Sequence, residues 1–253
     1  MSEINEYALE NLSLRGKTVL DAATGVGGAT EIWARRMDQQ GGDGQIISID
    51  IEQPEEIVAR IKHRLGELRK YVEFREDDIF ELATIKTESI DIINSDNTIV
   101  FLNPRPLRLL AALRKFHLVL KPGGKLIITS ELPIDKEKQH MGQWKRWNLA
   151  KAVRALKGEV WSSEPHPQQV SDALEAVGFD VLGHRTVPTR KEEDYTKIMD
   201  EWELLMRAEI EEIPWPQLKK PLQQSVVQVR EKVEEDGYLS VPPQYVVKCS
   251  KPA

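Results

Sequence analysis

The 253-residue chain contains a single cysteine, Cys249, which excludes an intramolecular disulfide and any zinc site built on cysteine. Its five histidines are scattered along the sequence, and we expect no metal site. No apolar run approaches the ~18 residues that a membrane helix needs. The N-terminus lacks the basic start and the apolar core of a signal peptide, so the sequence favours a cytoplasmic protein.

The chain also lacks an excess of positive charge. Its 41 acidic residues outnumber its 35 lysines and arginines, so the formal net charge is -6 and the sequence pI is about 5.6. This balance argues against non-specific binding to nucleic acid or to an anionic membrane surface. Apolar residues make up 40% of the chain, close to the globular average, so the chain is expected to fold. Its length allows one large domain with additions.

One stretch, Val19 to Thr30, organises the rest of the chain and reads VLDAATGVGGAT. An apolar run ends on Asp21, small residues follow, and a helical pattern then begins. Strand, tight turn and helix in this order are typical of the first unit of a nucleotide-binding doubly wound sheet. Small residues let the backbone approach a ligand, and the helix N-terminus presents free N–H groups to it.

Strand and helix patterns alternate along most of the chain, which predicts a parallel sheet covered by helices on both faces. We therefore expect an α/β fold with a doubly wound, seven-stranded, mostly parallel sheet whose last strand is antiparallel. The expected strands are 18–20, 45–49, 72–74, 90–94, 125–129, 179–187 and 245–249. The expected helices are 3–13, 29–40, 54–71, 104–120 and 168–177.

Two segments interrupt this alternation, and we interpret 1–253 as a single domain that carries them as insertions. The first, 132–164, follows the fifth strand and contains a helical apolar pattern. The second, 188–241, precedes the last strand and has two amphipathic stripes separated by the breaker Pro214-Trp215-Pro216. This pattern predicts a helical hairpin. Its apolar stripes could also form the contact of a homodimer.

Four motifs in order resemble those of the class I S-adenosylmethionine-dependent methyltransferases. They are the loop VLDAATGVGG, Asp50 after the second strand, Asp78-Ile79 after the third, and LVLKPGGKLIIT before the fifth. The resemblance covers about residues 14 to 187 and the last strand. It implies S-adenosylmethionine as the cofactor, bound at the carboxyl ends of the first three strands. The first glycine of the family's loop is Ala23 here, which keeps the turn small.

The resemblance implies a set of cofactor contacts from the loop and the strand ends: Asp21, Ala23, Thr24, Gly25, Gly27, Asp50, Ile51, Asp77, Asp78, Ile79 and Ser95. A carboxylate at a strand end can accept both vicinal hydroxyls of a ribose. Asp50 follows Gly25 by 25 residues, close to the ~20 expected for a ribose acid. Asp50 capping the helix near Pro54 is the alternative. Asp77 could replace Asp78 beside adenine, and either could cap the following turn.

Other classes of function fit the motifs less well. A nicotinamide dehydrogenase usually has three glycines in GxGxxG spacing, which Gly25, Gly27 and Gly28 do not match. A scaffold that binds the cofactor or a protein partner without catalysis, and a protein methyltransferase, stay open as alternatives. Asn94-Ser95-Asp96-Asn97 differs from the N/D-PP-Y/F turn of methyltransferases acting on nucleic-acid bases. We therefore expect a small-molecule acceptor, with no nucleic-acid or membrane partner.

The expected chemistry is direct in-line displacement from the sulfonium, which needs alignment and exclusion of water more than a catalytic dyad. Catalytic residues stay unassigned, and Asp96, His140 and Tyr195 are candidates for a general base by position alone. Asp96 and Asp135 offer fewer oxygens than Mg²⁺ requires, so we expect solvated loop acids. The first insertion begins at the carboxyl edge, and we expect it, rather than the hairpin, to cover the cofactor's methyl group.

Overall fold

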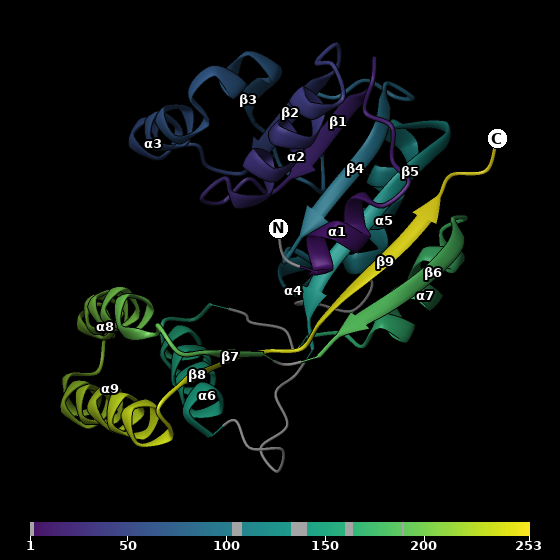
Figure 1. The fold of residues 1–253 in the computed structure, drawn as a ribbon. Coiled ribbons are helices and arrows are strands. Elements are labelled where there is room, and N and C mark those ends of the chain that lie inside the picture. Colours follow the sequence, from purple (N-terminus) through teal and green to yellow (C-terminus); the bar gives the residue numbers. More distant parts are fainter. Residues whose placement is uncertain (1–2, 103–107, 133–140, 160–163, 189) are drawn as a thin grey trace. The chain divides into compact units, whose positions relative to one another are not determined.

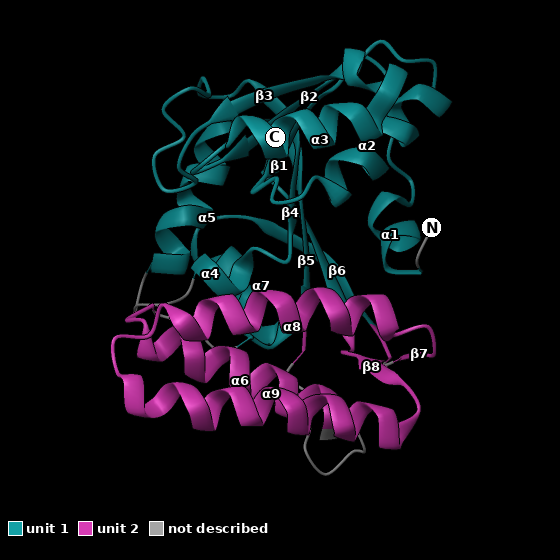
Figure 2. Cartoon of the chain, turned by 90° about the vertical axis from the view of Figure 1, so that its left-hand side faces the viewer, with its two compact units in different colours: residues 1–130, 164–186, 245–253 teal, residues 131–163, 187–244 magenta. Residues whose placement is uncertain are grey.

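The computed structural model describes residues 3–102, 108–132, 141–159, 164–188 and 190–253. The contacts within the chain divide it into two compact units, shown in different colours in Figure 2. Unit 1 consists of residues 1–130, 164–186 and 245–253, and unit 2 of residues 131–163 and 187–244. Unit 2 is therefore built almost entirely from the two segments that the sequence predicts as insertions.

Unit 1 contains one sheet of seven strands, which are β1 (Thr18–Ala22), β2 (Gln45–Asp50), β3 (Val72–Glu76), β4 (Ile90–Asp96), β5 (Leu120–Glu131), β6 (Asp180–Val187) and β9 (Gln244–Ser250). Their order in the sheet is β3-β2-β1-β4-β5-β9-β6. The strands from β3 to β5 pair in parallel. β9 runs against its neighbours β5 and β6 (Figure 1). The predicted doubly wound, seven-stranded, mostly parallel sheet is confirmed.

Helices cover both faces of this sheet. Figure 1 shows α1 (Glu3–Leu9) and α2 (Gly28–Gln39) on the near face, with α5 (Arg108–Val119) and α7 (Pro167–Ala176) on the far face. The remaining helices of unit 1 are α3 (Glu55–Leu65), the 3-10 helix η1 (Gly66–Tyr71) and the short α4 (Ile99–Leu102). Because both faces are covered, the central strands are almost continuous apolar runs, and Leu20, Ile46 and Ile93 are fully buried.

The order of the strands determines where a ligand can bind. The chain builds the sheet outward from β1 through β2 to β3, then returns to the other side of β1 with β4 and β5. Connections therefore diverge between β1 and β4, which leaves a crevice at their carboxyl ends. The loops that follow β1, β2, β3 and β4 all meet at this edge.

Two predicted boundaries are wrong in detail, and a third falls outside the described residues. The helix expected over 54–71 breaks at Gly66, whose φ of 54° and ψ of -125° suit only glycine, and it continues as the 3-10 helix η1. The strand expected from Lys125 begins at Leu120, and the four residues between them form a bulge, since Ile90 pairs with Leu120 and Ile92 with Lys125. The helix expected over 104–120 is described from Arg108, and Pro104 lies outside the described residues.

Unit 2 has a hydrophobic core of its own. Its helices are α6 (Met141–Leu156), α8 (Thr196–Glu211) and α9 (Pro216–Asp236), and its short strands β7 (Arg190–Glu192) and β8 (Leu239–Val241) pair antiparallel. Buried side chains of all three helices share one cluster, which includes Val153, Trp202 and Val229. The helices α8 and α9 lie where the sequence predicts a helical hairpin between the last two strands of the main sheet. The β7–β8 pair was not predicted.

Among the described residues, none of the helices combines the length and the apolar composition needed to cross a bilayer.

Candidate functional site

A pocket of about 520 Å³ lies at the carboxyl ends of the central strands of unit 1, within the size range of small-molecule sites. It is lined by Ala23, Gly25, Asp50, Ile51, Asp77, Asp78, Ile79, Phe80, Asp96, Asn97, Thr98, Phe101, Leu102 and Arg108. The first seven of these belong to the predicted cofactor contacts. The structure therefore brings together the loop after β1 and the acids after β2 and β3.

The loop after β1 approaches the pocket with its backbone. Ala23 has a φ of 67° and Gly25 a φ of 50°, so both occupy the left-handed region. A Cβ built on Gly25 would meet no atom within 4 Å, which shows open space above the loop. Gly27 has a different role, because its Cβ would lie 2.7 Å from Ile61 of α3. Gly27 thus lets α3 pack against the start of α2, and it does not line the pocket.

Asp50 closes the loop from the end of β2. Its Oδ2 accepts the N–H of Gly25 at 2.8 Å, and its Oδ1 accepts the N–H of Ile51 at 2.8 Å. It does not cap α3, because the N-cap of that helix is Pro54, without a side-chain hydrogen bond. A carboxylate can accept about four hydrogen bonds, so both oxygens retain capacity toward the pocket that Asp50 lines.

Asp21, at the end of β1, lies beneath this loop and does not line the pocket. Its carboxylate accepts hydrogen bonds from Thr30 at 2.5 Å, Asn94 at 2.8 Å and Ser48 at 3.3 Å, which join β1, β2, β4 and α2. Burial raises the pKa of Asp21 to about 6, although these hydrogen bonds oppose the shift. Thr24 also turns inward, where its hydroxyl contacts Ser48 at 2.7 Å.

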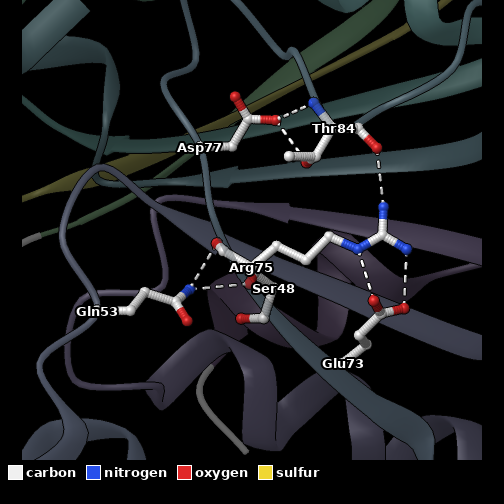
Figure 3. A network of polar contacts seen from close by, with 6 residues as sticks. All are labelled: Ser48, Gln53, Glu73, Arg75, Asp77 and Thr84. Atoms are coloured by element: carbon white, nitrogen blue, oxygen red, sulfur yellow. Dashed lines mark hydrogen bonds and ion pairs between the residues drawn. The ribbon is translucent and has the colours of Figure 1, made fainter.

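The two acids after β3 have different surroundings. Asp77 accepts the N–H of Ala83 at 3.0 Å, and the N–H and hydroxyl of Thr84 at 2.8 and 2.6 Å, which holds the loop after β3 in place (Figure 3). Burial alone would raise the pKa of Asp77, but these hydrogen bonds outweigh burial and lower it. The carboxylate of Asp78 accepts only the N–H of Phe80, at 2.9 Å, among the described residues.

Figure 3 also shows how the ends of β2 and β3 are joined. The side-chain amide of Gln53 donates to the carbonyls of Ser48 at 3.1 Å and Arg75 at 2.9 Å. Arg75 in turn donates to Glu73 and to the carbonyl of Thr84. These contacts fix the two strand ends that carry Asp50 and the acids after β3.

The exit of β4 supplies the other half of the pocket. Asp96 accepts a hydrogen bond from the hydroxyl of Thr129 and lines the pocket. Burial raises the pKa of Asp96, and the Thr129 hydrogen bond only partly offsets this. Ser95 is fully buried and does not line the pocket, and its hydroxyl has no hydrogen-bond partner among the described residues.

Sequence reasoning missed several lining residues, chiefly Phe80, Thr98, Phe101 and Arg108. Phe80 directly follows the predicted Asp78-Ile79 pair, which was the available signal. The guanidinium of Arg108 lies 4.0 Å from the centre of the Phe80 ring, a contact between segments far apart in sequence. Thr98 directly precedes the unpredicted helix α4, and Phe101 lies within it.

The other candidates by position lie elsewhere. His140 and Asp135 fall outside the described residues. Tyr195 packs against the core of unit 2. Among the residues that the structure describes, no three histidines, cysteines or acids are placed to hold a metal ion.

Comparison with known proteins agrees with this geometry. The family model described as a methyltransferase domain matches residues 13–201. Phosphoethanolamine N-methyltransferase 3 of Arabidopsis thaliana is 32% identical over 128 residues, which are 50% of this chain and 24% of that protein. The chain thus matches about a quarter of this relative's length.

Solved structures share the fold at lower identity. Haemonchus contortus phosphoethanolamine N-methyltransferase 2, in complex with phosphomonomethylethanolamine and S-adenosylhomocysteine, is 18% identical with a TM-score of 0.56. The match covers 98% of this chain and 53% of that one. The [4+2]-cyclase SpnF is also 18% identical, with a TM-score of 0.58 over 98% of this chain and 80% of that one. Such a likeness shows the fold, and the chemistry has to be argued from the pocket.

Proposed function

This chain belongs to the class I S-adenosylmethionine-dependent methyltransferases, and we propose that it methylates a small-molecule acceptor by direct in-line displacement. The observation that carries the proposal is the continuity of one pocket from the loop after β1 to Asp96 at the end of β4. When bound, S-adenosylmethionine supplies a methyl group already activated on a sulfonium. The chain has to bind this cofactor, align the acceptor and exclude water.

Several lining residues suit the parts of the cofactor. Asp50 offers a carboxylate for the ribose hydroxyls, and the open space above Gly25 admits a ligand close to the backbone. Ile79 and Phe80 provide apolar surface for an adenine ring, and Asp78 retains an oxygen for a polar edge. We assign these five residues to the cofactor on that basis.

The negative charge of the pocket supports binding of a cationic ligand. Four carboxylates, those of Asp50, Asp77, Asp78 and Asp96, line it together with one guanidinium, that of Arg108. This excess of negative charge favours the sulfonium of the cofactor and an acceptor that carries an amine. The relatives named for phosphoethanolamine N-methylation support an amine acceptor for this chain. The chain's net charge of -6 supports a small acceptor over a nucleic acid.

Asp96 is the residue we assign to the acceptor. Thr129 orients one of its oxygens, and the other has no hydrogen bond within the described residues. Because burial raises the pKa of Asp96, its carboxylate binds a proton more readily than a solvated acid does. Asp96 can therefore hold the nucleophile of the acceptor by its proton and take that proton as the methyl group moves.

The test measures S-adenosylhomocysteine formation from S-adenosylmethionine with phosphoethanolamine, ethanolamine and glycine as acceptors. Asp96→Asn should lower kcat by at least about 100-fold, a typical contribution of one positioned acid or base. Cofactor affinity should stay within about threefold, since Asp96 is not assigned to the cofactor. Thr129→Val is the matched control and should lower kcat less, because it leaves the carboxylate in place.

Three results would contradict the proposal. Unchanged kcat in Asp96→Asn would remove Asp96 from the reaction. Cofactor binding without transfer to any small acceptor, together with transfer to a protein fraction, would favour a protein methyltransferase. Binding with no transfer at all would favour a scaffold.

A further inference from the structure

A second cavity, of about 320 Å³, lies in unit 1 at the opposite edge of the sheet. It is bordered by the segment that leads into β1, by the start of β4 and by the bulge at the start of β5. Its lining residues are Asn11, Leu12, Ser13, Lys17, Asp91, Ile92, Lys121, Pro122, Gly123, Gly124 and Lys125. Three lysines and one acid line it, on a chain whose overall charge is negative.

Two of these lysines share a single carboxylate. The ammonium of Lys17 lies 3.0 Å from Oδ1 of Asp91, and the ammonium of Lys121 lies 2.7 Å from Oδ2. Asp91 also accepts the N–H of Thr18 at 3.0 Å. Burial alone would raise the pKa of Asp91, but the hydrogen bonds from Lys121, Thr18 and Lys17 outweigh it and lower the pKa. Asp91 is therefore charged at neutral pH, and one negative charge faces two positive ones.

The two ammoniums retain free donors. Each has three N–H groups and uses one of them on Asp91. The side chains of Lys17 and Lys121 are 43% and 41% exposed, so a solute can reach them. The shared carboxylate fixes both ammoniums near one point on the wall of the cavity.

Lys125 adds a third positive charge without an opposite one. It makes no ion pair with any residue that the structure describes. Burial lowers the pKa of the Lys248 ammonium on β9; the charge of Glu10 opposes this shift, and the positive charge of Lys125 adds to it. Like charges repel one another, and an anion bound beside Lys125 would offset its positive charge.

We propose that this cavity binds a small phosphate-bearing anion, at a site separate from the cofactor pocket. Three ammoniums against one carboxylate leave an excess of two positive charges, which matches a phosphate dianion or a pyrophosphate better than a carboxylate monoanion. Lysine ammoniums bind phosphate as point charges. The cavity exceeds the volume of one phosphate, so it admits an attached group as well.

The test is a titration of the ¹⁵N-labelled full chain with inorganic pyrophosphate, with acetate at matched ionic strength as the reference. Pyrophosphate should shift the amide signals of residues 11–17, 121 and 123–125 and leave those of 77–80 unchanged. Saturating S-adenosylhomocysteine should leave its affinity unchanged, since the two sites are separate. Acetate should shift these signals little.

Variants at Lys125 are the decisive test, because replacing this lysine leaves the ion pairs of Asp91 with Lys17 and Lys121 intact. Lys125→Gln should weaken pyrophosphate binding by about threefold or more, and Lys125→Glu by about tenfold or more. Lys197→Gln, in unit 2 with a side chain 86% exposed, is the control for a surface lysine and should have no effect. Thermal unfolding and a ¹⁵N spectrum without ligand verify that each variant is folded.

Three results would overturn the proposal: equal shifts with acetate and pyrophosphate, unchanged affinity in folded Lys125→Glu, or shifts spread over lysines of both units. Each of these results would show that the cavity does not bind a phosphate-bearing anion specifically. None would affect the proposed methyl transfer, which depends on the other edge of the sheet.

Discussion

Replacing Asp50 by alanine is the sharpest test of the cofactor assignment. Asp50 accepts the N–H groups of Gly25 and Ile51 at 2.8 Å each, so its carboxylate is held rigidly at the edge of the pocket. In Asp50→Ala the ribose hydroxyls lose a charged acceptor, which is worth about 1–3 kcal/mol and weakens binding about 5- to 150-fold. Asp50→Asn keeps the shape of the side chain and one acceptor oxygen. Its affinity for the cofactor should therefore lie between those of Asp50→Ala and the wild type.

Calorimetric titration with S-adenosylhomocysteine measures this loss, and thermal unfolding controls for the loop, since both N–H groups lose their partner. A thermodynamic cycle separates the ribose contact from a loosened loop. The wild type should bind 2′-deoxy-S-adenosylhomocysteine more weakly than S-adenosylhomocysteine. Asp50→Ala should bind the two ligands nearly equally.

Equal affinity of Asp50→Ala and the wild type for S-adenosylhomocysteine would refute the assignment. So would an unchanged penalty for the deoxy ligand in the variant, because the hydroxyl would then have another partner. A lower affinity with an unchanged deoxy penalty would indicate that Asp50 acts only by holding the loop.

Gly27→Ala should lower the free energy of unfolding by about 2–4 kcal/mol in a denaturant titration, because its Cβ would lie 2.7 Å from Ile61 at a φ of 77°. Gly25→Ala, which meets no atom within 4 Å, should cost only the backbone strain of about 1–2 kcal/mol, and equal losses would contradict the packing argument. Asp21 has a pKa of about 6 when folded, above its ordinary 3.8, so it binds a proton more tightly in the folded state. The contribution of Asp21 to the free energy of unfolding should therefore fall by about 1–2 kcal/mol as the pH rises from 5 to 7.5. If the same pH dependence of stability persists in Asp21→Asn, another group causes it. Hydrogen exchange with S-adenosylhomocysteine and a product bound should show added protection in 139–161 if the first insertion covers the methyl group, whereas protection confined to the hairpin would make the hairpin the lid.

The sequence predicted most of the strands and the pocket-lining acids because these signals are local. An apolar run that ends in an acid, as β2 ends in Asp50, needs no knowledge of the rest of the chain. In a parallel sheet all such ends meet at one edge, so the topology brought them together. The exits of β1, β2 and β3 line the pocket for this reason.

Features that depend on distant contacts were beyond the sequence. Asp77 and Asp78 are adjacent, and only the return of the chain at Thr84 separates their roles. The tight approach of Gly27 depends on where α3 passes, which no spacing indicates. The β7–β8 pair consists of three-residue strands far apart in sequence, too short to show an alternating pattern.

The arrangement of unit 2 has a consequence for how the chain reaches its native state. Its core combines Val153 of the first insertion with α8 and α9 of the second, and the strand β6 of the other unit lies between them in sequence. β9, which follows both insertions, takes its place between β5 and β6. During synthesis unit 2 is incomplete until residue 244 has been made, and unit 1 is incomplete until the segment after it has emerged. Partly made chains therefore expose the edges of β5 and β6, and protection by chaperones should matter most at that stage.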